Sequence, residues 1–185
     1  MTAGAGVFLD RDGTLIEDPG YVAHPEAVRL LPGSGAAVAR LNRAGLPAIV
    51  VTNQSGIARG RLTEADYRAT ESRLDALLAA EGARLSAHYF CPHHPELTGP
   101  CECRKPGTLL YREAAARFGL TLAACWWVGD RLRDVEPAGT LGGRGILVLT
   151  GSGQGEAAGA ETAGLTIVAD LAAAVDEILR HPTAR

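Results

Sequence analysis

The sequence has no long hydrophobic run and no surplus of positive charge. No segment approaches the roughly 20 apolar residues of a membrane-spanning helix, and the first residues do not combine a basic segment with an apolar export core. The 18 lysines and arginines are outnumbered by 21 aspartates and glutamates, for a formal net charge of −3. This balance gives no electrostatic reason to expect a nucleic acid or an anionic membrane as partner. We therefore expect a cytoplasmic protein.

Cysteine is also scarce, with four residues in the chain. In a reducing compartment such thiols are expected to be buried or to bind metal rather than to form disulfides. Cys125 falls in an apolar segment and is predicted to pack in the core. The other three cysteines lie within one short segment, which favours metal binding.

The 185 residues are 46% hydrophobic and 21% charged, which suits a single domain over residues 1–185. Predicted strands alternate with predicted helices, a pattern typical of βαβ crossovers. We expect an α/β fold, a Rossmann-like three-layer α/β/α sandwich with a mainly parallel sheet. The predicted strands are 6–9, 46–52, 87–90, 125–128, 145–149 and 165–168; the predicted helices are 34–44, 64–81, 108–118, 134–142 and a last one from 170.

Four local predictions concern helix ends and loops. Ser34 is expected to cap the helix that starts there, and Thr63 and Asp66 have the spacing of a capping box. Pro137 is expected in the first turn of its helix, where a missing N–H is tolerated. Residues 151–163, rich in glycine and alanine, are predicted to form a flexible loop.

Two acids end the first predicted strand. Asp10 and Asp12 stand one residue apart and are followed by Gly13, which permits a sharp turn. Two carboxylates so close raise each other's proton affinity unless a cation separates them, and oxygen ligands suit Mg²⁺. The alternative is an ordinary strand-to-loop junction with solvated acids.

Three later segments carry residues suited to phosphate chemistry. Thr52 ends the second predicted strand, Lys105 precedes a helix, and Asp130 and Asp134 follow the fourth strand. In a parallel sheet these positions meet at the carboxyl ends of the strands, where ligands bind. Each has a simpler explanation, since a threonine can close a turn, a lysine can face solvent and an aspartate can cap a helix.

Taken together, these four segments resemble the motifs of the haloacid dehalogenase (HAD) superfamily of phosphohydrolases, over residues 7 to about 150. The resemblance implies that Asp10 is the nucleophile and that Asp12 acts as general acid and base. It implies that Thr52 and Lys105 stabilise the transferred phosphoryl group. It also implies that Mg²⁺ is held by Asp10, by the backbone carbonyl of Asp12 and by Asp130. Asp134 would orient either Lys105 or a metal-bound water.

The cysteine-rich segment has the pattern C-x-H, seven residues, C-x-C. Cys91, His93, Cys101 and Cys103 would form a closed tetrahedral zinc site of the structural kind. Metal binding would order a loop with little core of its own, and so fix the cations that follow. Reduced cysteines with an incidental histidine are the alternative, and spacing leaves open whether His94 replaces His93 as ligand.

The gaps between the predicted elements leave no room for the cap domain that many members of the superfamily carry, so loops would select the substrate. The zinc loop resembles a branch that acts on sugar bisphosphates or, alternatively, on histidinol phosphate. We favour a sugar bisphosphate, because arginines are available to hold a second phosphate. The predicted substrate-binding residues are Asp18, Tyr21, Asn53, Gln54, Ser55, Arg59, Arg104 and Arg131.

The sequence is also compatible with three other classes of protein. A phospho-receiver domain uses similar residues, but its acid pair and its phosphorylated aspartate lie on different strands. A phosphatase of polynucleotide ends would need a basic groove, which the net charge disfavours. A zinc-stabilised binding module without catalysis is the third. We expect a monomeric, magnesium-dependent enzyme that acts on a small molecule.

Overall fold

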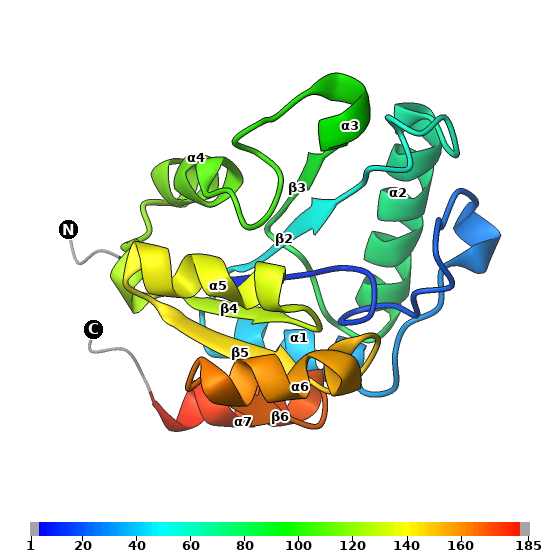
Figure 1. Ribbon diagram of the computed structural model, residues 1–185. Helices are drawn as coiled ribbons and strands as arrows, with labels where there is room; N and C mark the ends of the chain where they lie inside the picture. The colour runs from blue at the N-terminus through cyan, green and yellow to red at the C-terminus, as the bar shows by residue number, and fades with distance from the viewer. Residues whose placement is uncertain (1–3, 182–185) are drawn as a thin grey trace.

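A computed structural model describes residues 4–181 as a six-stranded sheet covered by helices on both faces (Figure 1). The strands lie in the order β3-β2-β1-β4-β5-β6, and every pairing between them is parallel. β1 therefore lies inside the sheet between β2 and β4. The strands are β1 (Val7–Leu9), β2 (Ala48–Asn53), β3 (Ala87–Cys91), β4 (Trp126–Gly129), β5 (Arg144–Val148) and β6 (Thr166–Val168).

Short connections and helices join the strands. The α-helices are α1 (Ser34–Arg43), α2 (Glu64–Ala80), α3 (Pro95–Thr98), α4 (Leu109–Phe118), α5 (Leu132–Leu141), α6 (Gly153–Thr162) and α7 (Leu171–Arg180), and the 3-10 helices are η1 (Pro25–Ala27) and η2 (Leu122–Ala124). The predicted three-layer α/β/α fold with a mainly parallel sheet is confirmed. Among residues 4–181, no helix combines the length and the hydrophobicity needed to cross a bilayer.

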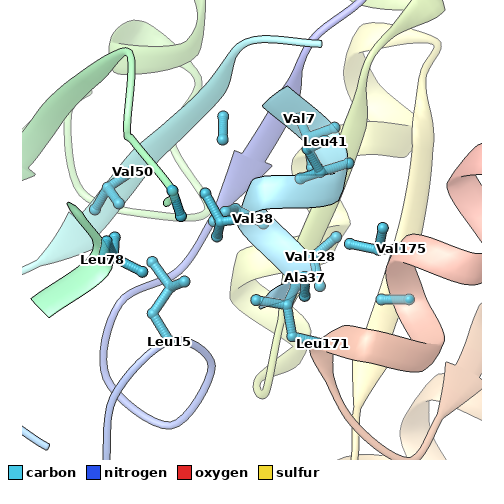
Figure 2. Packing of buried hydrophobic residues seen from close by; sticks show 14 of the residues in the cluster. Val7, Leu15, Ala37, Val38, Leu41, Val50, Leu78, Val128, Leu171 and Val175 are labelled. Atoms are coloured by element: carbon cyan, nitrogen blue, oxygen red, sulfur yellow. The ribbon is translucent and has the colours of Figure 1, made fainter. Parts of the chain in front are cut away.

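Helices bury both faces of the sheet, and successive side chains of each strand point to opposite faces. Val7 and Leu9 point to a cluster with α1, α2 and α7, whereas Phe8 between them points to a second cluster with α4 and α5. Figure 2 shows side chains of α1 and α7 gathered with those of β1, β2 and β4 in the first cluster. In the second, the ring of Phe8 meets those of Tyr111 and Trp127 at centroid distances of 5.1 and 4.9 Å. The side chains of β1 are thus packed on both faces of the sheet.

The capping box at α2 is confirmed, whereas the predicted cap at α1 is wrong. Thr63 Oγ1 accepts from the backbone N–H of Asp66 at 3.1 Å, and Asp66 Oδ2 accepts from the N–H of Thr63 at 2.7 Å. At α1 the residue before the helix is Gly33, with φ of 78°, and Ser34 is already helical. The Ser34 hydroxyl is buried and makes no hydrogen bond within the described residues. A positive φ favours glycine, so Gly33 rather than Ser34 occupies the N-cap position.

Two further predictions are wrong. Residues 153–162 form helix α6 rather than a flexible loop, and Ala160 of this helix is fully buried. Tertiary packing therefore overrides a weak local signal. Helix α5 begins at Leu132, two residues earlier than predicted, which places Pro137 inside the helix instead of in its first turn. Pro137 is buried there, and it cannot donate a backbone hydrogen bond to the preceding turn.

Candidate active site

The carboxyl ends of β1, β2 and β4 enclose a cavity of about 320 Å³. Asp10 follows β1, Thr52 lies near the end of β2, and Asp134 lies in the first turn of α5 after β4. The predicted residues Asp10, Asp12, Thr52 and Lys105 all line this cavity. The other lining residues are Asp18, Gly20, Tyr21, Asn53, Gln54, Ser55, Gly56, Arg131, Arg133 and Asp134.

A buried ion-pair cluster lies at the base of the cavity. Lys105 Nζ donates to Asp10 Oδ1 at 2.6 Å and to the carbonyl of Val51 at 2.7 Å, and it lies 2.8 Å from Asp134 Oδ1. Burial lowers the pKa of Lys105, but the charges of Asp10 and Asp134 outweigh burial and raise it. The ammonium group therefore stays charged beside the proposed nucleophile. Asp134 thus contacts Lys105 directly, and its role, to orient Lys105 or a metal-bound water, stays a prediction.

The backbone of Lys105 is held by a side chain of β2. Asn53 Oδ1 accepts from the N–H of Lys105 at 3.0 Å, and Asn53 Nδ2 donates to its carbonyl at 3.2 Å. This paired contact fixes the end of the cysteine-rich loop against the strand that carries Thr52. Lys105 lies in a loop, but its backbone is thereby anchored to β2.

Three carboxylates form a candidate cation site. Oxygen atoms of Asp10, Asp130 and Asp134 all lie within 4.8 Å of one another. Asp130 Oδ2 accepts from the N–H of Ser152 at 2.7 Å, whereas Asp130 Oδ1 is buried with no hydrogen-bond partner in the described residues. Burial and the charge of Asp10 raise the pKa of Asp130 to about 7. An unmatched buried oxygen among acids fits a hard divalent cation such as Mg²⁺.

Two glycines from distant segments enclose Asp130. Gly13, with φ of 83°, and Gly151, with φ of 54°, have conformations that favour glycine. A side chain at either position would collide with Asp130 Oδ2. The hydroxyl of Thr150 donates to the carbonyl of Gly13 at 2.6 Å and so joins the two turns. Gly13 and Gly151 thus form a slot around Asp130 Oδ2 that has no room for a side chain on either of them.

The carboxylate of Asp12 is fixed by two side chains. Gln54 Nε2 donates to Asp12 Oδ2 at 2.9 Å and to Thr52 Oγ1 at 3.0 Å. From the other side, Arg11 donates to both oxygens of Asp12. Burial raises the pKa of Asp12, and the charge of Arg11 opposes that shift. Arg11 was not among the predicted site residues, although an arginine between two strand-end acids is a visible signal in the sequence.

The predicted substrate-binding residues divide into two groups. Asp18, Tyr21, Asn53, Gln54, Ser55 and Arg131 line the cavity. Arg59 and Arg104 do not line it; Arg59 Nη2 lies 2.6 Å from His94 Nε2, and Arg104 Nη1 donates to the carbonyl of His93 at 3.2 Å. Arg133, which was not among the predicted residues, does line the cavity. Its position beside the predicted strand-end acids could have drawn attention to it.

The cysteine-rich loop brings its four predicted ligands together. Ligand atoms of Cys91, His93, Cys101 and Cys103 lie within 4.8 Å of one another. His93 Nδ1 is 3.3 Å from Cys103 Sγ, and Cys91 Sγ is 3.7 Å from Cys101 Sγ, which is close to the spacing around a tetrahedral zinc. Burial raises the pKa of Cys101, but hydrogen bonds from the Arg104 backbone and from neighbouring thiols lower it to about 7. The donor set fits structural zinc.

Two residues near this loop are outside the cluster. His94 is not among the four grouped ligands, and its ring contacts Arg59 instead. Cys125 lies in the core and donates to the carbonyl of Thr121 at 3.3 Å. All four cysteines are unpaired thiols, as expected for a chain whose cysteines bind metal or pack in the core.

A carboxylate at the tip of an inner strand, a buried lysine and an acidic cation site together define an aspartate-based hydrolase. A family profile described as HAD-hydrolase-like matches residues 102–174. A curated relative from Bordetella bronchiseptica is 38% identical over 177 residues, which are 95% of this chain and 98% of the relative. The protein therefore belongs to the family of HAD-like hydrolases.

Two of the curated relatives share one name. The relative from Bordetella bronchiseptica, and one from Salmonella typhi that is 38% identical over 91% of this chain and 94% of its own length, are both called D-glycero-beta-D-manno-heptose-1,7-bisphosphate 7-phosphatase. A crystal structure of D,D-heptose 1,7-bisphosphate phosphatase from B. bronchiseptica, complexed with magnesium and phosphate, superposes with a TM-score of 0.87 at 37% identity. It covers 95% of this chain and 98% of that one.

Proposed function

We propose that this protein is a magnesium-dependent phosphatase that removes the 7-phosphate of D-glycero-D-manno-heptose 1,7-bisphosphate and leaves heptose 1-phosphate. The support is the identity of 38% over nearly the whole length of relatives that carry this name, together with the cluster of Asp10, Lys105 and the acids around them. The relatives' name specifies the β anomer, and we propose the same anomer here.

In this proposal the reaction has two displacements at phosphorus. Asp10 attacks the 7-phosphate, its carboxylate oxygen bonds to phosphorus, and the P–O bond to the sugar breaks. Asp12 gives its proton to the departing sugar oxygen. Asp12 then takes a proton from water, the water oxygen attacks phosphorus, and the Asp10 carboxylate leaves, which releases inorganic phosphate.

Cationic groups make the first approach possible, because a carboxylate and a phosphate dianion repel each other. Lys105, in contact with Asp10 at 2.6 Å, offsets this repulsion from one side. Thr52 offers a hydroxyl to a phosphoryl oxygen. Mg²⁺ held by Asp10, the carbonyl of Asp12 and Asp130 would neutralise phosphoryl charge when bound.

Residues at the rim of the cavity would hold the rest of the substrate. Arg131 and Arg133 line it and can bind the second phosphate with paired N–H groups. Asp18 lies 3.4 Å from Arg131 and restricts its side chain. Tyr21, Asn53, Gln54 and Ser55 would contact sugar hydroxyls. Arg59 and Arg104, which do not line the cavity, would reach only a part of the substrate that extends beyond it. The protein would act as a monomer on this small molecule.

Phosphate release from a substrate panel tests the proposal. Both anomers of the heptose bisphosphate, other sugar bisphosphates and histidinol phosphate are compared with MgCl₂ and with EDTA. We expect the heptose β anomer to have the highest kcat/KM and EDTA to abolish turnover. A preference for histidinol phosphate would instead favour the second function predicted from the sequence.

The nucleophile is tested by Asp10→Asn, which removes the attacking carboxylate. We expect a loss of activity by a factor of 10³ or more, on the order of the effect of deleting a covalent nucleophile. Asp176→Asn is the matched control, because Asp176 is half exposed on α7 and pairs only with Arg40 in the described structure. Equal activity of Asp10→Asn and Asp176→Asn would overturn the assignment.

A further inference from the structure

Arg11 lies between the two aspartates that end β1, yet it faces away from the cavity. Its side chain is 1% exposed, whereas the neighbouring side chain of Asp12 is 16% exposed and lines the cavity. A buried arginine carries a large desolvation cost unless its donors are matched. The donors of Arg11 must therefore be matched by acceptors within the protein.

The guanidinium group of Arg11 donates hydrogen bonds to Asp12 on one side and to Thr70 on the other. On one side Nε and Nη2 donate to Asp12 Oδ1 at 3.2 and 2.9 Å, and Nε also lies 3.1 Å from Asp12 Oδ2. On the other side Nη1 donates to Thr70 Oγ1 at 3.0 Å, and the group lies over the ring of Tyr67 at 5.1 Å from its centroid. Tyr67 and Thr70 belong to α2. Arg11 thus connects Asp12 to a helix nearly sixty residues away.

Thr70 is itself oriented for this contact. Its hydroxyl donates to the carbonyl of Tyr67 at 2.7 Å, so its oxygen is free to accept from Arg11. Thr70 is 1% exposed, and water does not compete for the bond. Because the guanidinium is planar, fixing Nη1 at Thr70 also fixes the direction in which Nε and Nη2 point.

We propose that Arg11 is a positioning residue that holds the carboxylate of Asp12, through Thr70 of α2, in the place from which it protonates the leaving alcohol. This inference rests on the proposed function, in which Asp12 is the general acid. Proton transfer needs the acid within hydrogen-bond reach of the leaving oxygen. A displacement of about 1 Å at such a group costs on the order of 100-fold in rate.

The leaving group distinguishes this role from a merely structural one. A sugar alkoxide is a poor leaving group and needs the proton of Asp12 when the P–O bond breaks, whereas 2,4-dinitrophenolate departs without one. Displacing Asp12 should therefore slow the sugar substrate and spare the aryl phosphate. General loosening of the fold would slow both. The comparison uses kcat/KM, which reports the steps up to release of the first product and leaves out the later hydrolysis at Asp10.

The first variant is Arg11→Lys, which keeps the positive charge but loses the fork of donors. We expect the ratio of kcat/KM for the sugar bisphosphate to that for 2,4-dinitrophenyl phosphate to fall at least about tenfold, a part of the 10²–10⁴ that a general acid supplies. A circular dichroism spectrum and a thermal transition like those of the wild type establish that the variant is folded.

The second test uses a matched pair at Thr70, which does not line the cavity. Thr70→Val removes the oxygen that accepts from Arg11, and we expect the same ratio to fall by a factor of about three to ten. Thr70→Ser keeps the hydroxyl and is expected to keep the wild-type ratio.

The possible outcomes separate the two proposals. If Arg11→Lys and Thr70→Val lower kcat/KM for both substrates by the same factor, or for neither, the positioning role is wrong while the proposed function stands. If the wild type hydrolyses neither phosphate ester, the proposed function fails and the positioning role fails with it. A selective loss in Arg11→Lys and Thr70→Val, but not in Thr70→Ser, supports the proposal.

Discussion

Asp130 has one carboxylate oxygen bonded to the backbone and one buried without a partner in the described structure. Burial and the charge of Asp10 raise the pKa of Asp130 to about 7, and the same causes raise that of Asp134 to about 6. Both acids therefore bind a proton more tightly in the folded chain than in the unfolded chain, where the ordinary pKa of an aspartate is 3.8. Without metal, their contribution to stability is present below about pH 4 and is lost as the pH rises to about 7.

This titration predicts a pH-dependent response to magnesium. At pH 8 both acids must ionise, and Mg²⁺ offsets their repulsion; at pH 5 protons compete with it. We expect 10 mM MgCl₂, on the order of a saturating concentration, to raise the Tm more at pH 8 than at pH 5. Asp130→Asn should remove the difference, and Asp176→Asn on the surface should keep it. Equal magnesium shifts at the two pH values would contradict the cation site.

At this scale the sequence predicted the residues that lie at strand ends, because parallel strands bring their carboxyl ends to one edge. Asp10, Thr52 and Lys105 meet there as expected. Their catalytic roles stay predictions. The contact between Arg11 and Thr70 could not be predicted, because it joins a strand end to the middle of a helix and follows from no local pattern.

The zinc loop is the element whose structure depends most on a ligand. Its four donors come from the end of β3 and from the coil before Arg104, and outside them the loop has only the single short helix α3. Bound metal would then supply much of the folding energy of this segment. We expect about one zinc per chain in elemental analysis of the purified protein.

Adjacent histidines provide a matched test of the ligand set. His93 lies in the donor cluster, whereas His94 contacts Arg59. We expect His93→Ala to lose most of its zinc and His94→Ala to retain it. Loss of zinc should also lower phosphatase activity, because Lys105 ends this loop. Zinc content unchanged in His93→Ala would remove His93 from the ligand set.

Among the helices, α2 was predicted well and α6 was missed. α2 has a capping box and buried side chains at helical spacing, and its predicted bounds were nearly right. α6 contains three glycines, each of which costs a helix about 1 kcal/mol relative to alanine. The burial of Ala160 favours the helix, and a local pattern does not report such packing.

The molecule as a whole is predicted to unfold as one unit. The first hydrophobic cluster draws on α1, α2, α7 and four strands, so one cavity in it should weaken the entire sheet. We expect Leu41→Ala to lower the free energy of unfolding by roughly 2–5 kcal/mol. Urea titrations followed by tryptophan fluorescence and by circular dichroism should coincide. Two separate transitions would contradict the prediction of a single domain.

At the same scale, the fold class was predictable but the order of the strands was not. Alternating strands and helices indicate a parallel sheet. Every inner strand is apolar, however, so the pattern does not say which strands are neighbours. The placement of β1 between β2 and β4 follows from the crossovers, and it is what brings Asp10 next to Thr52 and Asp130.

The slot formed by Gly13 and Gly151 limits how this protein can change. Behind Asp130 even a methyl group has no space, so both positions would tolerate only glycine in any library of variants. Tyr21 also lines the cavity but is 49% exposed, so substitutions there disturb less of the fold. Selection for new substrates should therefore change Tyr21 and leave the two glycines untouched.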